Sequence, residues 1–302
     1  MITHEDIGAA AKRIAGRVRR TPVVEIAPRL WLKLELVQHT GSFKPRGMFN
    51  RVLANDVPAA GLTVASGGNA GLAVAYVGRE LGHPVEVFVP ETTPRLKADR
   101  LRDYGAHVTA VGESYADALV ASQARADESG ALFVHAYDQP EVVAGQGTLA
   151  RELALQVSDA QTILVSVGGG GLIGGIAAWY ADTPTRVVAV EPVGCPTLHD
   201  ARAAGAPVDV QTEGIARDSL GARRIGAIAW ALSEAGHIDD SLLVDDGAIA
   251  EARRWLWREA RLAVEPGAAT AMAALLNGAY QPEQDETVVV VICGANADPA
   301  DL

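Results

Sequence analysis

The chain has 302 residues, of which 49% are hydrophobic, and a formal net charge of −11. This length suits one large α/β domain or two moderate ones. The acidic excess argues against a nucleic-acid partner, because neutralising phosphates takes a basic surface. Aliphatic runs such as Val288–Ile292 are far shorter than the roughly 20 residues that cross a bilayer, so we expect no membrane partner.

Cysteine content and the N-terminus indicate the compartment. Cys195 and Cys293 are too few for a disulfide framework and suit a reducing cytosol. Residues 1–6 are acidic and lack the apolar core of a secretion signal. We therefore expect a cytoplasmic protein that acts on a small molecule.

The N-terminal part of the chain leads to an unusual lysine. Apolar spacing predicts a helix over residues 5–18, and alternation over residues 30–35 predicts a strand. Lys44 then stands between Phe43 and Pro45. Because proline disfavours helical geometry at the preceding residue, we expect Lys44 on a bend, with a helix only after residue 47.

Such a lysine has two interpretations. A partly desolvated amine can lose its proton near neutral pH and attack a carbonyl. The segment is equally compatible with an ordinary surface turn.

From residue 61 onward, strands and helices alternate at short intervals, which is typical of parallel sheets with helical crossovers. The expected strands are 62–66, 85–89, 108–111, 132–135, 162–167, 186–190, 242–244 and 287–292. The expected helices are 70–81, 94–104, 115–129, 140–157 (interrupted by its glycines), 172–179, 198–204, 219–235, 249–261 and 267–276. We interpret residues 61–138 as a smaller domain inserted in a larger one made of residues 1–60 and 139–302.

Two strand-to-helix turns carry groups that suit anions. Gly168–Gly171 offers successive N–H groups at a helix start, where the helix dipole favours a phosphate. No Lys-Ser/Thr pair follows, which argues against a nucleotide P-loop, whereas Glu191 leaves a dinucleotide site open. The turn Ser66–Ala70 adds N–H groups and the amide of Asn69, although Asn69 taken alone is better explained as an N-cap.

These segments, in this order, resemble the pyridoxal-phosphate (PLP) enzymes of fold type II, in the serine/threonine dehydratase and serine racemase group. The matching segments are Gly41–Gly47, Ser66–Ala70, Val89–Pro94, Ala144–Thr148, Gly168–Leu172, Val190–Pro192, Glu265–Gly267 and Cys293–Asn296. The resemblance covers nearly the whole chain. It implies an α/β fold like the tryptophan synthase β chain, with two open parallel-sheet domains, the smaller inserted in the larger.

The resemblance also implies roles for individual residues. Lys44 would bind PLP covalently and serve as the catalytic base. Further cofactor-binding residues would be Phe43, Asn69, Gly168, Gly169, Gly170, Gly171, Leu172, Gly214, Glu265 and Cys293. Substrate-binding residues would be Ser66, Gly67, Gly68, Asn69, Ala70 and Tyr137.

Cys293 matches the family's Ser or Cys that faces the pyridine nitrogen of PLP. A thiol, with an ordinary pKa of ~8.5, does not hold a proton on that nitrogen as a carboxylate would. Neutral pyridine is a weaker electron sink, which favours expulsion of a β-leaving group over a long-lived carbanion. Cys293 can also be simply a small buried hydrophobe.

The resemblance includes a metal site that this sequence departs from. Glu191 and the carbonyl of Cys195 match two of the three protein ligands in serine racemases. The third is normally Asp and here is Thr197. Since losing a carboxylate weakens a divalent oxygen site, we expect no tightly bound Mg²⁺ or Ca²⁺, and a monovalent cation stays open.

We therefore expect a PLP-dependent ammonia-lyase that converts L-threonine and/or L-serine to 2-oxobutanoate or pyruvate and ammonia by β-elimination. In serine racemases the second acid is a Ser of a Ser-Ser-Gly-Asn-His loop, and here that position is Gly67. Alternatives are a serine racemase, a dehydratase for 3-hydroxyaspartate or phenylserine, a silent amino-acid-binding protein and a nucleotide-binding oxidoreductase. We expect a homodimer without a C-terminal regulatory domain or isoleucine feedback.

Overall fold

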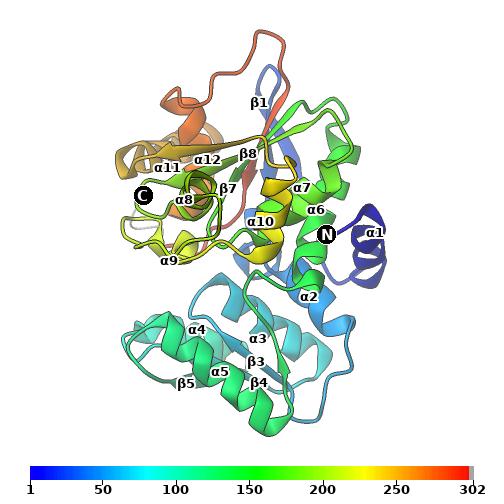
Figure 1. Cartoon of the computed structure of the whole chain (residues 1–302), viewed down its shortest axis with the longest axis vertical. Helices are drawn as coiled ribbons and strands as arrows, with labels where there is room; N and C mark the ends of the chain where they lie inside the picture. The colour runs from blue at the N-terminus through cyan, green and yellow to red at the C-terminus, as the bar shows by residue number, and fades with distance from the viewer. Residues whose placement is uncertain (299–302) are drawn as a thin grey trace.

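The structure is a computed structural model that describes residues 1–298, and it has two lobes, drawn one above the other in Figure 1. The strands of the larger lobe are β1 (Val23–Ala27), β2 (Leu30–Leu34), β7 (Thr162–Ser166), β8 (Arg186–Pro192), β9 (Asp240–Val244) and β10 (Val288–Ile292). The strands of the smaller lobe are β3 (Leu62–Ala65), β4 (Val85–Val89), β5 (His107–Ala110) and β6 (Leu132–Phe133). Two sheets of parallel strands, as the resemblance implies, are thus present.

The larger sheet has the order β1-β2-β10-β7-β8-β9, and the smaller has the order β5-β4-β3-β6. Within the described residues, β1 and β2 are antiparallel and all other neighbours in the two sheets are parallel. Every residue of β10 is buried, as expected of a β-branched strand with helices on both faces. The carboxyl end of β10, where open α/β sheets place their sites, carries Cys293.

Helices cover both sheets. They are α1 (His4–Arg13), α2 (Pro45–Leu53), α3 (Asn69–Leu81), α4 (Arg95–Asp103), α5 (Tyr115–Ser129), α6 (Pro140–Gln156), α7 (Gly171–Tyr180), α8 (Thr197–Ala204), α9 (Arg217–Leu220), α10 (Ala227–Glu234), α11 (Asp246–Ala260) and α12 (Pro266–Leu276), with 3-10 turns η1 (Glu35–Val37) and η2 (His39–Gly41). Helix α2 lies where the two lobes meet (Figure 1). The residue that precedes it, Lys44, therefore lies at their junction.

Local signals explain several helix ends. Ser114 accepts a hydrogen bond from the N–H of Asp117, and the Asp117 side chain accepts one in return, which forms a capping box at the start of α5. Gly130 ends the same helix with φ +74, a left-handed conformation that glycine adopts without a Cβ clash. The predicted helix over residues 115–129 is confirmed.

Other predictions of secondary structure were wrong. The single helix expected over residues 219–235 is divided into α9 and α10, because the N–H of Gly226 donates to the carbonyl of Gly169 instead of continuing a helix. The first helix ends at Arg13, ahead of Gly16 with φ +75. Strand β1 was not predicted, and it is an edge strand held by its pairing with β2.

The glycines of α6 do not interrupt it, contrary to expectation. A Cβ on Gly145 would lie 2.6 Å from the carbonyl oxygen of Arg46, so glycine is needed for α2 to pack closely on α6. This contact supports the segment that carries Lys44.

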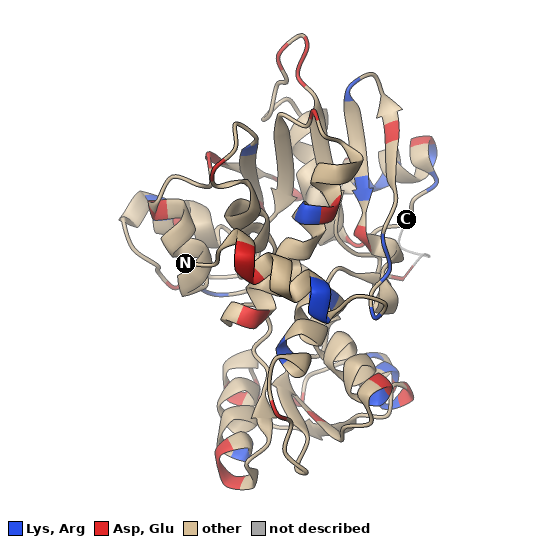
Figure 2. Cartoon of the chain, turned by 90° about the vertical axis from the view of Figure 1, so that its right-hand side faces the viewer, with Lys and Arg blue, Asp and Glu red and all other residues tan. Residues whose placement is uncertain are grey.

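The smaller sheet lies within residues 61–138, and the domain boundaries at 60/61 and 138/139 stay a prediction. Figure 2 shows acidic and basic positions interspersed over both lobes. Within residues 1–298 we find no helix with the length and apolar character needed to cross a membrane.

Candidate active site

Lys44 lies at the start of α2 with its ammonium group directed inward. Its Nζ donates to the carbonyl of Ala136 at 2.8 Å and lies 5.1 Å from the centre of the Phe43 ring. Burial lowers the pKa of Lys44 to about 8, an effect that the charge of Glu265 only partly offsets. The amine is thus deprotonated far more readily than that of an exposed lysine, as the nucleophilic interpretation requires.

The expected bend at Lys44 is not present. Lys44 has the helical dihedral angles φ −52 and ψ −38 and is the N-cap of α2, and its carbonyl accepts from the N–H of Met48 at 3.2 Å. The helix therefore begins at Pro45 and not after residue 47 as expected. The general bias against helical geometry before proline is overcome here by tertiary contacts. The N–H of Phe43 donates to the carbonyl of Cys293 at 3.1 Å, which ties the Lys44 segment to the end of β10.

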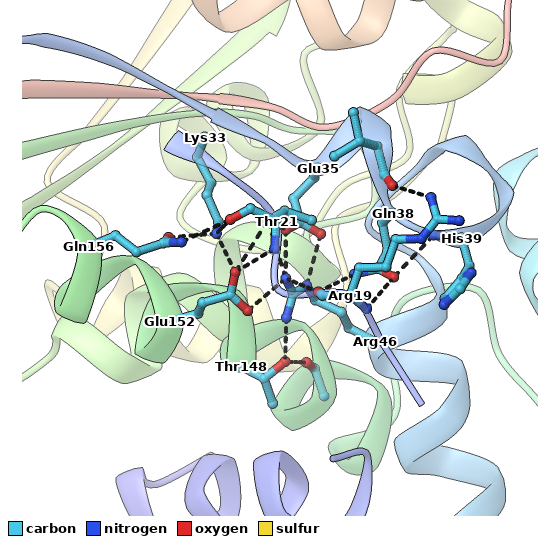
Figure 3. Close-up of polar contacts among 12 residues, drawn as sticks. Arg19, Thr21, Lys33, Glu35, Gln38, His39, Arg46, Thr148, Glu152 and Gln156 are labelled. Carbon is cyan, nitrogen blue, oxygen red and sulfur yellow. Dashed lines mark hydrogen bonds and ion pairs between the residues drawn. The ribbon is translucent and has the colours of Figure 1, made fainter. Parts of the chain in front are cut away.

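A buried ionic cluster, which we call the Arg46 cluster, holds the first turn of α2 (Figure 3). Arg46 donates through Nε and Nη2 to the two carboxylate oxygens of Glu35, each at 2.8 Å, and through Nη2 to Glu152 at 3.1 Å. Lys33 donates to Glu152 at 2.6 Å. Arg46, Glu35 and Lys33 are essentially excluded from solvent. The cluster pairs two cations, Arg46 and Lys33, with two anions, Glu35 and Glu152. Sequence reasoning missed it, because Glu152 lies more than 100 positions from Lys33 and Arg46 in the sequence.

The Gly168–Gly171 loop lies at the start of α7. Its carbonyls are occupied: Thr197 donates to Gly168, Gly226 to Gly169 and Gly174 to Gly170. Within residues 1–298, the N–H groups of Gly168–Gly171 donate to no protein acceptor. Free N–H groups at a helix start fit an anionic group such as a phosphate.

Tyr137 packs directly on this loop. A Cβ on Gly169 would lie 2.4 Å from the Tyr137 ring, and one on Gly171 would lie 2.7 Å from its carbonyl oxygen. Burial raises the pKa of Tyr137 to about 12, and its hydroxyl donates to the carbonyl of Arg224. Tyr137 therefore lies beside the expected phosphate site, and its contact with substrate stays a prediction.

The Ser66–Ala70 turn joins β3 to α3. Gly68 is the N-cap and Asn69 is the first helical residue, so the interpretation of Asn69 as an N-cap was wrong. Its amide instead donates to Glu265 at 2.8 Å. Ser66 Oγ accepts from the N–H of Gly68, and Ala70 is buried and faces the small-lobe core.

Glu265 and Cys293 are the other buried groups near Lys44. Burial raises the pKa of Glu265 to about 7, although Asn69 and the N–H of Asn296 both donate to its carboxylate. Burial, and secondarily Glu265, raise the pKa of the Cys293 thiol well above its ordinary value, so it stays protonated at neutral pH. The predicted residues Lys44, Asn69, Glu265 and Cys293 are thus brought together.

Two other predicted positions lie apart from this group. Gly214 has φ +86 and lies against the side chain of Asp246 at the start of α11, and its role stays a prediction. Leu172 is buried in the first turn of α7, in the core of the large lobe.

The residues at the positions of the family's metal site form hydrogen bonds with the surrounding protein. The Glu191 carboxylate accepts from the N–H groups of Leu198 and His199 at 2.8 Å and from Ser241 Oγ at 3.0 Å, and Thr197 Oγ1 lies 3.0 Å from it. Burial raises the pKa of Glu191. Cys195 Sγ lies 3.4 Å from the carbonyl of Glu213. The single proton of Thr197 Oγ1 is already donated to the carbonyl of Gly168 at 2.6 Å, so Thr197 lies between Glu191 and the glycine loop.

Sequence reasoning also missed a set of residues beside Asn69. Helix α4 brings Lys97 and Arg100 to a small cavity that Asn69, Glu265 and Asn296 also line. Lys97 pairs with Asp218 across the two lobes, and Arg100 donates to Asn296 at 2.8 Å. No local pattern indicated these contacts, because they join residues about 120 or more positions apart in the sequence.

Residues 14–294 match the family described as pyridoxal-phosphate dependent enzymes. The chain belongs to this family. The enzyme is 35% identical to an L-threonine ammonia-lyase of Geobacter sulfurreducens, over 99% of this chain and 76% of that protein. Its fold is similar to maize serine racemase, with a TM-score of 0.92, 32% identity, and 98% and 94% of the two chains covered. It is also similar to a T.th. threonine deaminase, with a TM-score of 0.90, 33% identity, and 98% and 99% covered.

These findings confirm the expected fold, which is the α/β architecture of the fold-type II PLP enzymes, and the threonine dehydratase and serine racemase family. PLP is the cofactor of the enzyme. The free N–H groups of Gly168–Gly171 and the buried amine of Lys44 fit its phosphate and its aldehyde. The relatives include both ammonia-lyases and racemases, so the choice between the two reactions depends on the residues of the site.

Proposed function

We propose that the enzyme is an ammonia-lyase that removes water and then ammonia from L-serine, L-threonine or both. The observation that carries the proposal is the identity of residue 67. Gly67 lies in the loop expected to face the substrate, and it has no side chain that could hold or deliver a proton. A racemase needs a second acid on the face opposite its lysine, whereas β-elimination needs none.

The described residues offer a partner for each part of the cofactor. We infer that the N–H groups of Gly168–Gly171 bind the phosphate, that Asn69 binds the ring hydroxyl, and that Cys293 faces the ring nitrogen. The buried thiol of Cys293 stays neutral and does not protonate that nitrogen. Ser66 and the N–H groups of the following glycines would bind the substrate carboxylate.

When bound, PLP supplies an electron sink that acidifies the α-hydrogen of an amino acid. Lys44 would take that proton as general base, for which its pKa of about 8 is well suited at physiological pH. The bond from Cβ to the hydroxyl oxygen would then break, and the leaving hydroxide takes up one proton and departs as water. The proton taken up balances the one that Lys44 removes from Cα, so the α-hydrogen and the hydroxyl are lost together as water. The released enamine takes up water and yields the 2-oxo acid and ammonia, which balances the reaction.

A positioned general acid typically raises the rate of proton transfer 10²–10⁴-fold. Because residue 67 offers none, racemisation should be much slower than elimination. The argument applies equally to larger β-hydroxy amino acids such as 3-hydroxyaspartate. The homodimer and the cytoplasmic location stay predictions from the sequence.

The test is a 2-oxo-acid assay over L- and D-serine, L- and D-threonine, 3-hydroxyaspartate and phenylserine, with the enantiomers separated by chiral chromatography. We expect pyruvate or 2-oxobutanoate from the L-amino acids, formed much faster than any D-enantiomer. Interconversion of L- and D-serine at the rate of pyruvate formation would refute the lyase. Binding of PLP without any turnover would instead favour the silent binding protein.

A further inference from the structure

A continuous path of hydrogen bonds runs from helix α4 to the buried carboxylate beside Lys44. Arg100 Nη2 donates to Asn296 Oδ1 at 2.8 Å, Asn296 Nδ2 donates to Asn69 Oδ1 at 2.7 Å, and Asn69 Nδ2 donates to Glu265 Oε1 at 2.8 Å. We call these four residues the Arg100–Glu265 path. Every donor points in the same direction, so each bond polarises the next.

The two ends of the path fix the orientation of both amides. Arginine has donors only, so Asn296 must present its oxygen to Arg100 and its nitrogen to Asn69. Asn69 must then present its oxygen to Asn296 and its nitrogen to Glu265. Asn296 Nδ2 also donates to the carbonyl of Thr40 at 2.7 Å, and its backbone N–H donates to Glu265, which holds the middle of the path in place.

Arg100 differs from its neighbour Lys97 in how its charge is used. Lys97 forms an ion pair with Asp218 in the same cavity. The partner of Arg100 there is the neutral amide of Asn296. No opposite charge neutralises the guanidinium in this contact, so its charge polarises the amide of Asn296. Arg100 comes from the small lobe and Glu265 from the large one, so the path also joins the two lobes.

We propose that Arg100 is a positioning residue of the cofactor site: acting through Asn296, it holds the amide of Asn69 in the orientation that donates to Glu265. Asn69 is the residue inferred above to bind the ring hydroxyl of PLP. An amide held in one orientation binds that hydroxyl without first losing rotational freedom, so Arg100 strengthens PLP binding although it does not touch the cofactor.

The test compares the affinity for PLP of the apo forms of Arg100→Ala, Arg100→Lys and Arg102→Ala, in the absence of any amino acid. Arg102 is the matched control, because it is an exposed arginine of the same helix that pairs with Asp99. We expect Arg100→Ala to raise the PLP dissociation constant roughly three- to tenfold, the usual effect of losing one charge-assisted hydrogen bond. Arg100→Lys should retain most of the affinity, and Arg102→Ala should bind like the parent enzyme.

A double-mutant cycle tests whether Arg100 acts through Asn296. In the Asn296→Ala background, Arg100→Ala should change the PLP dissociation constant by less than about twofold. Full additivity of the two substitutions would overturn the proposal, as would equal losses in Arg100→Ala and Arg102→Ala. If Asn296→Ala does not fold, the comparison of Arg100→Ala with Arg102→Ala decides alone. Because no substrate is present, a failed lyase assay would not affect this result.

A second readout separates positioning from a merely structural role. Charged or titratable groups that act on Glu265 are Lys44, Asp218 and Cys293, and Lys97 neutralises Asp218. Asn69 donates to the ionised form of Glu265, so loss of that bond should raise the pKa of Glu265 and move to higher pH the midpoint of any change in the bound-cofactor absorbance that follows the ionisation of Glu265. We expect this shift in Arg100→Ala and not in Arg102→Ala, and an unchanged midpoint in both would contradict the proposal.

Discussion

The Arg46 cluster allows a quantitative prediction for Glu35→Gln. The substitution keeps the size of the side chain and removes its charge from a site that is fully excluded from solvent. Arg46 then loses a bidentate partner at 2.8 Å and keeps only Glu152, which is 15% exposed. Removing one partner of a buried pair typically costs about 3–5 kcal/mol.

We expect the lower end of that range, because Glu152 still compensates part of the Arg46 charge and the new amide can accept one hydrogen bond. The free energy of unfolding should therefore fall by about 3 kcal/mol, which is roughly a 150-fold change in the folding equilibrium. The matched control is Glu251→Gln, since Glu251 also accepts two hydrogen bonds from one arginine, Arg254, although both end on a single oxygen and its side chain is half exposed. The control should change stability by less than about 0.5 kcal/mol.

The assay is equilibrium unfolding in urea, followed by tryptophan fluorescence and by far-UV circular dichroism, with coincident curves required before free energies are compared. A pH series tests the direction in which the stability contributed by Glu35 changes with pH. Burial alone would raise the pKa of Glu35, but the charge and hydrogen bonds of Arg46 outweigh it and the pKa lies below its ordinary value. The stability from Glu35 is therefore present above pH ~4.3 and lost as the pH falls through its folded pKa. Equal unfolding midpoints for Glu35→Gln and Glu251→Gln at neutral pH would refute this reasoning.

Three further predictions concern the site. EDTA should leave the rate unchanged, because Glu191 already accepts hydrogen bonds from the N–H groups of Leu198 and His199 and from Ser241; a large loss that Mg²⁺ restores would contradict this. Gly67→Ser should raise D-serine formation relative to pyruvate; a Cβ there would lie 3.3 Å from Thr93 Cγ2, so the Thr93 side chain has to shift slightly to admit it. An unchanged product ratio would count against the racemisation argument. The rate at which apo-enzyme captures added PLP should rise with pH to a plateau above about 8, because Lys44 attacks as the free amine; a midpoint near 10 would mean that burial does not lower its pKa.

Local sequence signals predicted the regular part of the fold well. The strand over residues 85–89 and the helix over residues 115–129 have the predicted bounds, because alternation, an N-cap and a terminal glycine all agree there. The helix expected over residues 219–235 failed because a tertiary hydrogen bond from Gly226 competes with the helix. The prediction of non-helical geometry at Lys44 failed for a similar reason, since packing of α2 on α6 overrides the conformational bias of a residue before proline.

The site was predictable to the extent that its residues lie in recognisable segments. Lys44, Asn69, Glu265 and Cys293 were all named from the sequence, and the structure brings them close to one another. Arg100 and the Arg46 cluster were not named. Their partners lie in distant parts of the chain, and neither a charge on a helix nor one on a strand indicates which of many carboxylates or amides it will meet.

The most direct test of the account is to locate the covalent attachment of PLP. The holoenzyme is reduced with borohydride, digested and mapped by mass spectrometry, with Lys12, Lys33 and Lys97 as internal controls in the same chain. The account predicts the PLP label on Lys44, and it predicts that Lys44→Ala folds, carries no label and forms no 2-oxo acid from L-serine or L-threonine. A label on another lysine, or parental turnover in Lys44→Ala, would contradict it.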